Sequence, residues 1–448
     1  MAQLNAQSNN VIPSQDTSHL EPFLVLDHTE SLCPVCLKVL PADIVQGQDK
    51  AVYMRKVCPE HGQYTVYLWP DVEHYLWTKN FRIPEKPPSF SHSPSRGCPL
   101  DCGLCSSHRR GPTLVEIEVT QRCNMRCPVC FMEADQADPK KFSDLSFNVI
   151  EQIYKDILTK SGPETSIQIT GGEPTTHHDL PGVIRLGREL GFSAIEINTN
   201  GLRAGKDLAY VQSLAEAGAS GIFLQFDGLR GEIYQKTRGA DLLNCKLQAI
   251  ENCRQVGLQV VLAMTVISGV NHDQLGAVLE FALKNRDVIA GIAYQPAFTS
   301  GRFDVVQERR LTMGDVMFLL TEQTKGLLSP YELWPLGCSH PLCSSSTYLI
   351  EKDGQIVPFT RFLTPQEYRD YYDYQSPQGS VLADIAVRRY PELEPGISIV
   401  IMNYMDAMTI DLRRLRECSM LVADQHGRLY PFCSYQLTNI HGQKLSEV

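Results

Sequence analysis

The sequence predicts an α/β protein built around a partial (β/α)6 TIM-like barrel, with a cysteine-rich domain on either side of it. Three observations lead to this fold class. Strand-like and helix-like segments alternate through the middle of the chain, polar and glycine-rich positions follow the strands, and most cysteines form local groups. Alternating strands and helices indicate a parallel sheet, and the functional residues of a barrel follow its strands.

Each predicted element is justified by its local pattern. The strands are β-branched, alternating or short apolar segments, and helical patterns separate them. The predicted strands are 114–120, 166–172, 194–200, 221–228, 259–267 and 289–297, and the predicted helices lie near 145–160, 180–190, 206–217, 240–256, 273–285 and 312–324.

Composition divides the chain into four predicted regions. Residues 1–20 are polar and typical of a disordered lead-in. Residues 21–110 are rich in Cys, Pro and aromatics and predict a small domain held together by metal. The barrel is expected over 111–305, and a C-terminal cysteine-bearing domain over 306–448.

Charge and hydropathy exclude several classes of function. The net charge of -10 argues against broad binding of nucleic acid. No apolar run is long enough to predict a transmembrane segment, and the N-terminus lacks the pattern of a signal peptide. We therefore expect a cytoplasmic protein. In that reducing compartment its 15 cysteines are better explained as metal ligands than as disulfides.

The central motif is "RCNMRCPVC", which places Cys123, Cys127 and Cys130 directly after the first barrel strand. A structural zinc site is usually closed by four ligands. Three thiols can instead hold three irons of a [4Fe–4S] cluster and leave the fourth iron open for a substrate or cofactor. A zinc knuckle is the alternative.

A second motif, "ITGGEPT", ends the second strand and contains Gly171, Gly172, Glu173 and Pro174. Glycines let the backbone approach a ligand closely. Together the two motifs resemble the radical S-adenosylmethionine (SAM) superfamily. The resemblance implies a radical SAM barrel in which SAM binds the open iron, next to the glycine edge, and is cleaved to methionine and a 5′-deoxyadenosyl radical.

Polar residues at the later strand ends are further candidates for the SAM pocket. Asn198 and Asn200 fall where the superfamily contacts SAM, although an Asn-Gly turn explains "NTNG" equally simply. Gln225 and Asp227 are expected to face the site. Later polar residues either line the pocket or are satisfied within their loops: Thr265, Asn271, Gln295 and Arg302.

Two cysteine groups precede the barrel. Cys33, Cys36 and Cys58 read as a zinc-ribbon or rubredoxin-like site for one Zn or Fe, with His61 or a later cysteine as fourth ligand. A further triplet repeats the C-x3-C-x2-C spacing just upstream of the barrel and predicts an auxiliary cluster: Cys98, Cys102 and Cys105.

The C-terminal region supplies four thiols, the number that fully ligates a [4Fe–4S] cluster, with zinc as the alternative. They are Cys338, Cys343, Cys418 and Cys433. One or two auxiliary clusters are thus expected in all. Cys245 and Cys253 lie on a helical segment and are predicted to be core thiols.

The motifs run in order from "CPVC" to "GRLYPFCSY" and resemble a multi-cluster family that includes the archaeal tetraether lipid synthase, also described as class D radical SAM methylases. The resemblance implies an enzyme that forms carbon–carbon bonds at unactivated carbons with electrons from a flavodoxin- or ferredoxin-type donor. Where the family pattern carries a further cysteine, this sequence has Thr113, which leaves the upstream cluster short of one local ligand.

Three functions follow from these motifs. The sequence favours lipid coupling, which would bring the protein to the membrane periphery. The first alternative is a C-methylase that uses a methylene-folate or pterin-type carbon donor. The second is a non-catalytic iron–sulfur electron carrier, which would have no need of an amino-acid-binding turn such as "GGEP".

Overall fold

A computed structural model of the chain describes residues 20–81, 83–88, 93–133, 144–336, 339–373, 381–391 and 396–447. Residues 1–19 of the expected lead-in, and Cys338, lie outside the described residues. In the described part of the chain no helix is both long enough and apolar enough to cross a membrane.

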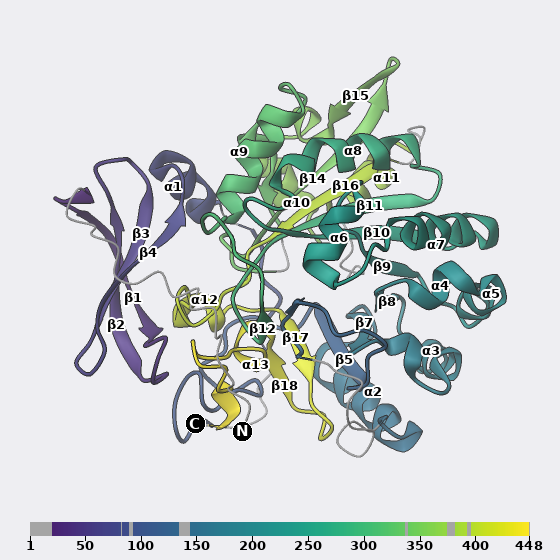
Figure 1. The fold of residues 1–448 in the computed structure, drawn as a ribbon, viewed down its shortest axis with the longest axis horizontal. Coiled ribbons are helices and arrows are strands. Elements are labelled where there is room, and N and C mark those ends of the chain that lie inside the picture. Colours follow the sequence, from purple (N-terminus) through teal and green to yellow (C-terminus); the bar gives the residue numbers. More distant parts are fainter. Residues whose placement is uncertain are drawn as a thin grey trace, which may run out of the picture.

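The N-terminal region forms an antiparallel sheet at the left of Figure 1, in the order β1-β2-β3-β4. The sequence predicts a small domain held together by metal in this region, but it does not predict the antiparallel sheet. Its metal-ligating residues lie in the two turns at one end, between β1 and β2 and between β3 and β4. The elements are β1 (Leu24–Leu32), β2 (Val39–Gln46), β3 (Val52–Cys58), β4 (Gly62–Trp69) and α1 (Val72–Asn80).

The six predicted barrel strands are all present, parallel and adjacent, which confirms the α/β partial barrel. On β5 the apolar Val115, Ile117 and Val119 are buried in the main core, while Glu116 and Glu118 alternate with them on the other face. The barrel interior therefore carries polar side chains. The strands are β5 (Leu114–Thr120), β7 (Ser166–Gly171), β8 (Ile195–Thr199), β9 (Gly221–Gln225), β10 (Gln259–Val266) and β11 (Ile289–Pro296).

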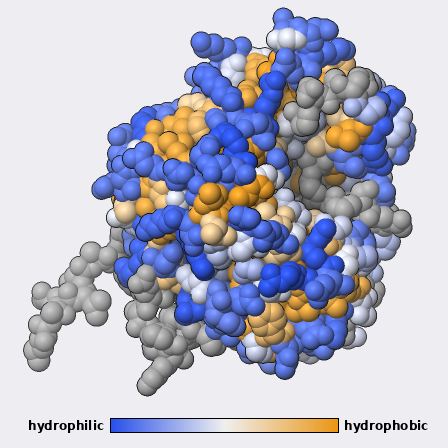
Figure 2. All heavy atoms as spheres, turned by 90° about the vertical axis from the view of Figure 1, so that its right-hand side faces the viewer, coloured by the Kyte–Doolittle hydropathy of each residue, from blue (hydrophilic) through white to orange (hydrophobic). Residues whose placement is uncertain are grey.

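Helices cover the outside of these strands. On α3, Asp179 accepts a hydrogen bond from Gly182 N at the start, and the helix buries Leu180, Val183 and Ile184. Figure 2 shows hydrophilic side chains over much of the face that the barrel helices form, with small apolar patches between them. The helices are α2 (Phe147–Ser161), α3 (Leu180–Glu189), α4 (Leu202–Lys206), α5 (Leu208–Glu216), α6 (Gly231–Arg238), α7 (Leu243–Val256) and α8 (Leu275–Lys284).

The C-terminal region extends the barrel sheet at both edges. β16 (Ile397–Met402) pairs in parallel with β11, and β17 (Met420–Ala423) pairs in parallel with β5. Consequently, segments far apart in sequence close around the barrel. The remaining elements are β6 (Val129–Cys130), β12 (Arg302–Phe303), β13 (Trp334–Pro335), β14 (Ser344–Lys352), β15 (Gln355–Pro358), β18 (Leu429–Pro431), α9 (Met313–Gln323), α10 (Pro365–Tyr371), α11 (Val381–Arg389), α12 (Leu412–Leu415) and α13 (Phe432–Tyr435).

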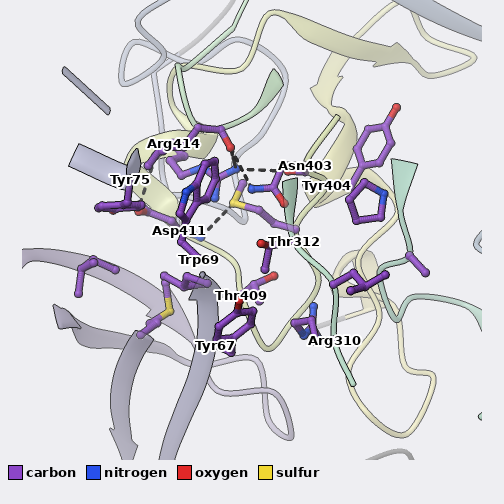
Figure 3. A pocket seen from close by; sticks show the side chains of 18 residues that line it. Tyr67, Trp69, Tyr75, Arg310, Thr312, Asn403, Tyr404, Thr409, Asp411 and Arg414 are labelled. Atoms are coloured by element: carbon purple, nitrogen blue, oxygen red, sulfur yellow. Dashed lines mark hydrogen bonds between the residues drawn. The ribbon is translucent and has the colours of Figure 1, made fainter. Parts of the chain in front are cut away.

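C-terminal segments also join the N-terminal sheet to the barrel, and α12 lies between them in Figure 1. The buried Lys56 of β3 donates hydrogen bonds to Ser31 Oγ (3.0 Å) and to the carbonyls of Ala407 and Met408 (3.1 and 2.8 Å). Figure 3 shows the small cavity of about 30 Å³ at this junction, where aromatic residues of the N-terminal region meet polar residues of the C-terminal region. Its labelled members include Tyr67, Trp69, Tyr75, Arg310, Asn403, Asp411 and Arg414.

Candidate active site

A cavity of about 770 Å³ occupies the barrel and reaches the C-terminal region. This volume suits a small-molecule or cofactor site. Its lining extends along the strands, from Leu114 and Gln259 at strand starts to Gly171 and Gln295 near strand ends. Both the central cysteine triplet and three cysteines of the C-terminal region face it: Cys123, Cys127, Cys130, Cys343, Cys418 and Cys433.

The central triplet lies on the loop after β5. Cys130 is in β6 and is the register partner of Arg302 in β12, and Arg302 Nη1 donates to the carbonyl of Cys127 (3.0 Å). Burial raises the pKa of Cys123 to about 12. The triplet is not among the groups of described ligands that gather within 4.8 Å. Three such thiols fit three irons of a cluster better than one metal ion, because a cluster separates its ligands.

Gly171 and Gly172 are required by contact with the cysteine loop. A Cβ on Gly171 would stand 2.0 Å from the carbonyl oxygen of Thr120, and one on Gly172 would stand 2.3 Å from that of Arg122. From the sequence, these glycines were expected to allow close approach of a ligand. They do line the cavity, but what they admit first is the backbone of the loop that carries Cys123.

Glu173 fastens the ends of two barrel strands together. Its buried carboxylate accepts hydrogen bonds from Thr175 Oγ1 and Thr199 Oγ1 (2.6 Å each) and from the backbone N–H of Asn200 (2.7 Å). Pro174 begins the short turn that Glu173 caps. Glu173 thus holds Asn200, whose side-chain amide in turn donates to Asn124 Oδ1 in the cysteine loop (2.7 Å).

The other predicted polar residues divide into two groups. Asn198, Asn200, Gln225, Thr265, Gln295 and Arg302 line the cavity. Asp227 and Asn271 are not in its lining. Asn271 is committed to its own loop, since its amide donates to the carbonyls of Asp227 and Thr265.

Asp227 faces a buried cation rather than the cavity. Arg238 Nε and Nη2 donate to its two carboxylate oxygens (2.7 and 3.0 Å), and Arg238 itself lines the cavity. Burial alone would raise the pKa of Asp227, but the guanidinium of Arg238 holds it below its ordinary value. Sequence reasoning missed Arg238 because it lies on a helix, ten residues beyond the strand-end motif.

Lys246 of α7 was also missed. It is buried, which lowers its pKa to about 8, and its ammonium donates to Gln225 Oε1 (2.7 Å) and to the carbonyl of Asn200. No spacing in the sequence distinguishes this lysine from the surface lysines of other helices.

The N-terminal cysteines form a compact metal site. Ligating atoms of Cys33, Cys36, Cys58 and His61 all lie within 4.8 Å of one another. Cys58 Sγ is 3.4 Å from His61 Nδ1, and Cys36 Sγ is 4.0 Å from Cys58 Sγ. The sequence left either His61 or a later cysteine as the fourth ligand, and the structure places His61 beside the three cysteines. Three cysteines and one histidine are a common ligand set of structural zinc.

The upstream triplet lies outside the cavity. Cys98, Cys102 and Cys105 are absent from its lining, and Cys102 Sγ is 3.4 Å from Ser434 Oγ. Thr113 lines the cavity, and its buried hydroxyl finds no hydrogen-bond partner among the described residues. The two core-thiol predictions differ in burial: Cys253 is fully buried in the main core and Cys245 is partly exposed.

Three C-terminal thiols line the same cavity as the central triplet. Arg414 Nη2 donates to Cys343 Sγ (3.3 Å), and Met405 N donates to Cys433 Sγ (3.3 Å). Burial raises the pKa of Cys433 to about 12 and raises that of Cys418. The set of four expected from the sequence is described here for three members, because Cys338 falls outside the described residues.

Polar side chains from the barrel interior complete the lining. Glu116 of β5, Gln168 of β7 and Glu196 of β8 are register partners in one row, and all three face the cavity. Sequence reasoning missed them, although a signal was present. Charged or amide residues alternate with isoleucine in "VEIEV", "IQIT" and "IEIN", whereas parallel strands are usually apolar throughout.

Two family models match the chain. The model of the radical SAM superfamily covers residues 117–282, and that of the HMPTM N-terminal zinc ribbon domain covers residues 25–70. These matches fall on the barrel and on the N-terminal sheet.

Curated relatives match either the whole chain or the barrel alone. The chain is 32% identical to the 7,8-dihydro-6-hydroxymethylpterin dimethyltransferase of Methanocaldococcus jannaschii, over 94% of each chain. It is 31% identical to the "Probable GTP 3′,8-cyclase" of Archaeoglobus fulgidus, over 40% of this chain and 57% of that one. Among solved structures, Streptococcus suis SuiB bound to S-adenosylmethionine is 18% identical, with a TM-score of 0.38 over 48% of this chain and 44% of that one.

Proposed function

Because this chain belongs to the radical SAM superfamily, in the family of the Methanocaldococcus jannaschii pterin dimethyltransferase, we propose that it is a C-methylase acting on a reduced pterin. The membership confirms the resemblance seen in the sequence. The chain is an enzyme that uses SAM and a [4Fe–4S] cluster, rather than the electron carrier considered above. The relative supports the methylase alternative over the lipid coupling that the sequence motifs favoured.

The proposal of a pterin substrate rests on the row of polar side chains inside the barrel. Glu116, Gln168 and Glu196 face the cavity, and burying carboxyl groups against a hydrocarbon chain would cost several kcal/mol, roughly 2–7 for each polar group left without a partner. A pterin offers ring nitrogens, an amino group and a carbonyl to such side chains. The interior therefore offers hydrogen-bonding partners to a polar heterocycle.

The proposed reaction replaces a C–H bond of the pterin by a C–CH3 bond. One methylene unit from a methylene-folate-type donor, two electrons and two protons give the methylated pterin and the free donor. Each SAM that is reductively cleaved to methionine and 5′-deoxyadenosine takes two further electrons and one proton. An external reductant supplies these electrons, as in the superfamily, and we propose a flavodoxin- or ferredoxin-type protein.

Cys123, Cys127 and Cys130 would hold the [4Fe–4S] cluster, which when bound supplies the reductive cleavage of SAM. Glu173 positions the strand end beside this loop through Asn200. Two arginines line the cavity next to the triplet: Arg238, whose charge is paired with Asp227, and Arg302, which donates to the carbonyl of Cys127. Cys343, Cys418 and Cys433 would hold an auxiliary cluster in the same cavity.

The test is SAM cleavage by the anaerobically reconstituted enzyme. With a strong reductant, the wild type should form 5′-deoxyadenosine faster when 6-hydroxymethyl-7,8-dihydropterin is present, and a Cys127→Ala variant should form none. Cys245→Ala is the matched control, because Cys245 is outside the cavity lining. Stimulation by isoprenoid ether lipid instead of the pterin would overturn the proposed substrate.

A further inference from the structure

In the row of Glu116, Gln168 and Glu196, the two residues on β7 and β8 are hydrogen-bonded to each other and Glu116 is not part of that bonding. Gln168 Nε2 donates to Glu196 Oε2 (3.0 Å), and Gln168 Oε1 accepts from Asn198 Nδ2 (3.2 Å). Both functional ends of Gln168 are thus committed toward β8. On the β5 side, the carboxyl group of Glu116 receives no hydrogen bond and no ion pair from the residues that the structure describes.

Glu118 is the natural comparison, because it lies two residues further along β5 on the same face. Its carboxylate accepts hydrogen bonds from Gln436 Nε2 (2.9 Å) and from the hydroxyl of Tyr435 (3.4 Å), and it is not part of the cavity lining. The strand therefore carries one carboxyl group satisfied by the protein and one directed at the cavity.

The carboxyl group of Glu116 faces the cavity and is otherwise enclosed by the protein. Glu116 is only 5% exposed, and burial, with the neighbouring Glu118 in addition, raises its pKa to about 8. Such an arrangement is explained when a ligand brings the missing hydrogen-bond donors.

Resting on the proposed function, we infer that Glu116 is the residue that recognises the pterin ring. Its carboxyl group gives up its proton to solvent when the pterin binds, and the resulting carboxylate accepts the two adjacent N–H donors of the 2-amino-4-oxopyrimidine edge. Two carboxylate oxygens match two parallel donors, as in other paired hydrogen bonds to carboxylates. Glu196 lies two strands away in the same row, with Gln168 between them.

The paired donors distinguish a pterin from close analogues. The corresponding lumazine has a carbonyl in place of the 2-amino group, so it would face Glu116 with an acceptor. A site built to hydrogen-bond a substrate rejects an analogue that leaves its buried polar group unpaired. Glu116 is therefore a specificity-determining residue.

The experiment is equilibrium binding to the reconstituted holoenzyme, followed by ligand fluorescence. The wild type should bind 6-hydroxymethyl-7,8-dihydropterin roughly 10- to 100-fold more tightly than the matching lumazine, the size expected for hydrogen bonds to a charged group. The Glu116→Gln variant should lose that preference, and the Glu118→Gln variant should keep it.

The possible results distinguish a failure of this inference from a failure of the proposed function. Equal binding of both ligands by the wild type, an unchanged preference in Glu116→Gln, or the same loss in Glu118→Gln would overturn the role of Glu116, while methylated pterin in turnover would still support the function. Failure of the wild type to bind or methylate the pterin would overturn both. The wild-type comparison of the two ligands decides the matter even if Glu116→Gln fails to fold.

Discussion

Two buried acidic side chains near the cavity differ in the partners that their carboxyl groups find. Asp227 is paired with Arg238 and also accepts from Thr237 Oγ1 (2.8 Å), whereas Glu116 has no such partner among the described residues. The first group holds a cation beside the cysteine loop, since Arg238 also donates to the carbonyl of Val129. The second is available to a ligand. Their contributions to stability should differ accordingly.

Asp227→Asn should destabilise the protein by about 3–5 kcal/mol, because it leaves the buried Arg238 without its counter-charge. Asp273→Asn is the matched control. It removes an Arg–Asp pair in which both side chains are exposed, and should cost less than about 1 kcal/mol. Urea unfolding of the reconstituted proteins measures both changes. Equal midpoints for the two variants would contradict the structural role of Asp227.

Glu116 should make the free enzyme less stable as pH rises. Its pKa is about 8 in the folded protein, while an unfolded glutamate has a pKa near 4.3. Between about pH 5 and 8 the native state holds a proton that the unfolded chain has lost. The contribution of Glu116 to the free energy of unfolding therefore falls by about 1.4 kcal/mol for each rise of one pH unit in this range. The titratable groups facing Glu116 are Glu118 and Tyr404.

The measurement is urea unfolding at pH 6 and pH 8 without pterin. Glu116→Gln should gain stability relative to the wild type at the higher pH, and Glu118→Gln serves as the comparison. A wild type and Glu116→Gln variant that respond identically to pH would show that Glu116 does not carry a raised pKa.

At the scale of elements, the end of β7 and the cysteine loop after β5 form one unit. Gly171→Ala should destabilise it by about 1–3 kcal/mol for the backbone conformation, at φ +139°, plus a further cost from overpacking. Gly191→Ala has a positive φ of +105° but open space around the new methyl, so it isolates the conformational cost. Thermal unfolding of both variants tests this, and equal losses would contradict the close packing.

The N-terminal metal site should depend on His61. His61→Ala should lower zinc content to well below one ion per chain without changing iron content, because His61 is the fourth ligand in a set that lies on its own sheet. His28→Ala, an exposed histidine on β1 of the same sheet, should leave zinc unchanged. Metal analysis by mass spectrometry measures both. Full zinc occupancy in His61→Ala would exclude His61 as a ligand.

The elements that sequence could predict are those set by local pattern. The six barrel strands follow from alternating residues such as those of "LVEIEVT", and the helices between them from their periodicity. The pairing of β16 with β11 and of β17 with β5 could not be predicted, because those partners lie about a hundred or several hundred residues away and only packing brings them together.

The same limit applies to the site. Motif spacing predicted Cys123, Cys127 and Cys130, strand ends predicted Asn198 and Asn200, and all of them line the cavity. Arg238 and Lys246 reach the site from helices, where no motif marks them. Asp227 sits at a strand end as expected, but its orientation depends on Arg238, which sequence alone does not place.

For the whole molecule, the main consequence of the fold is that two sets of thiols share one cavity. Cys418 lies just before β17, which pairs with β5, and the chain returns through β18 to Cys433 in α13. A substrate in this cavity would share it with the central cysteine triplet, the C-terminal thiols and the polar row of the barrel. This arrangement suits a reaction that needs both hydrogen abstraction and further electrons at one carbon.

The central claim, methylation of a reduced pterin at carbon, is tested most directly by the origin of the new carbon. The reconstituted enzyme would receive reductant, SAM, 6-hydroxymethyl-7,8-dihydropterin and a methylene donor carrying heavy carbon, and the product would be weighed by mass spectrometry. We expect a pterin that gains one or two methyl groups, each with the label. A pterin of unchanged mass, or a methyl group that comes unlabelled from SAM, would contradict the claim.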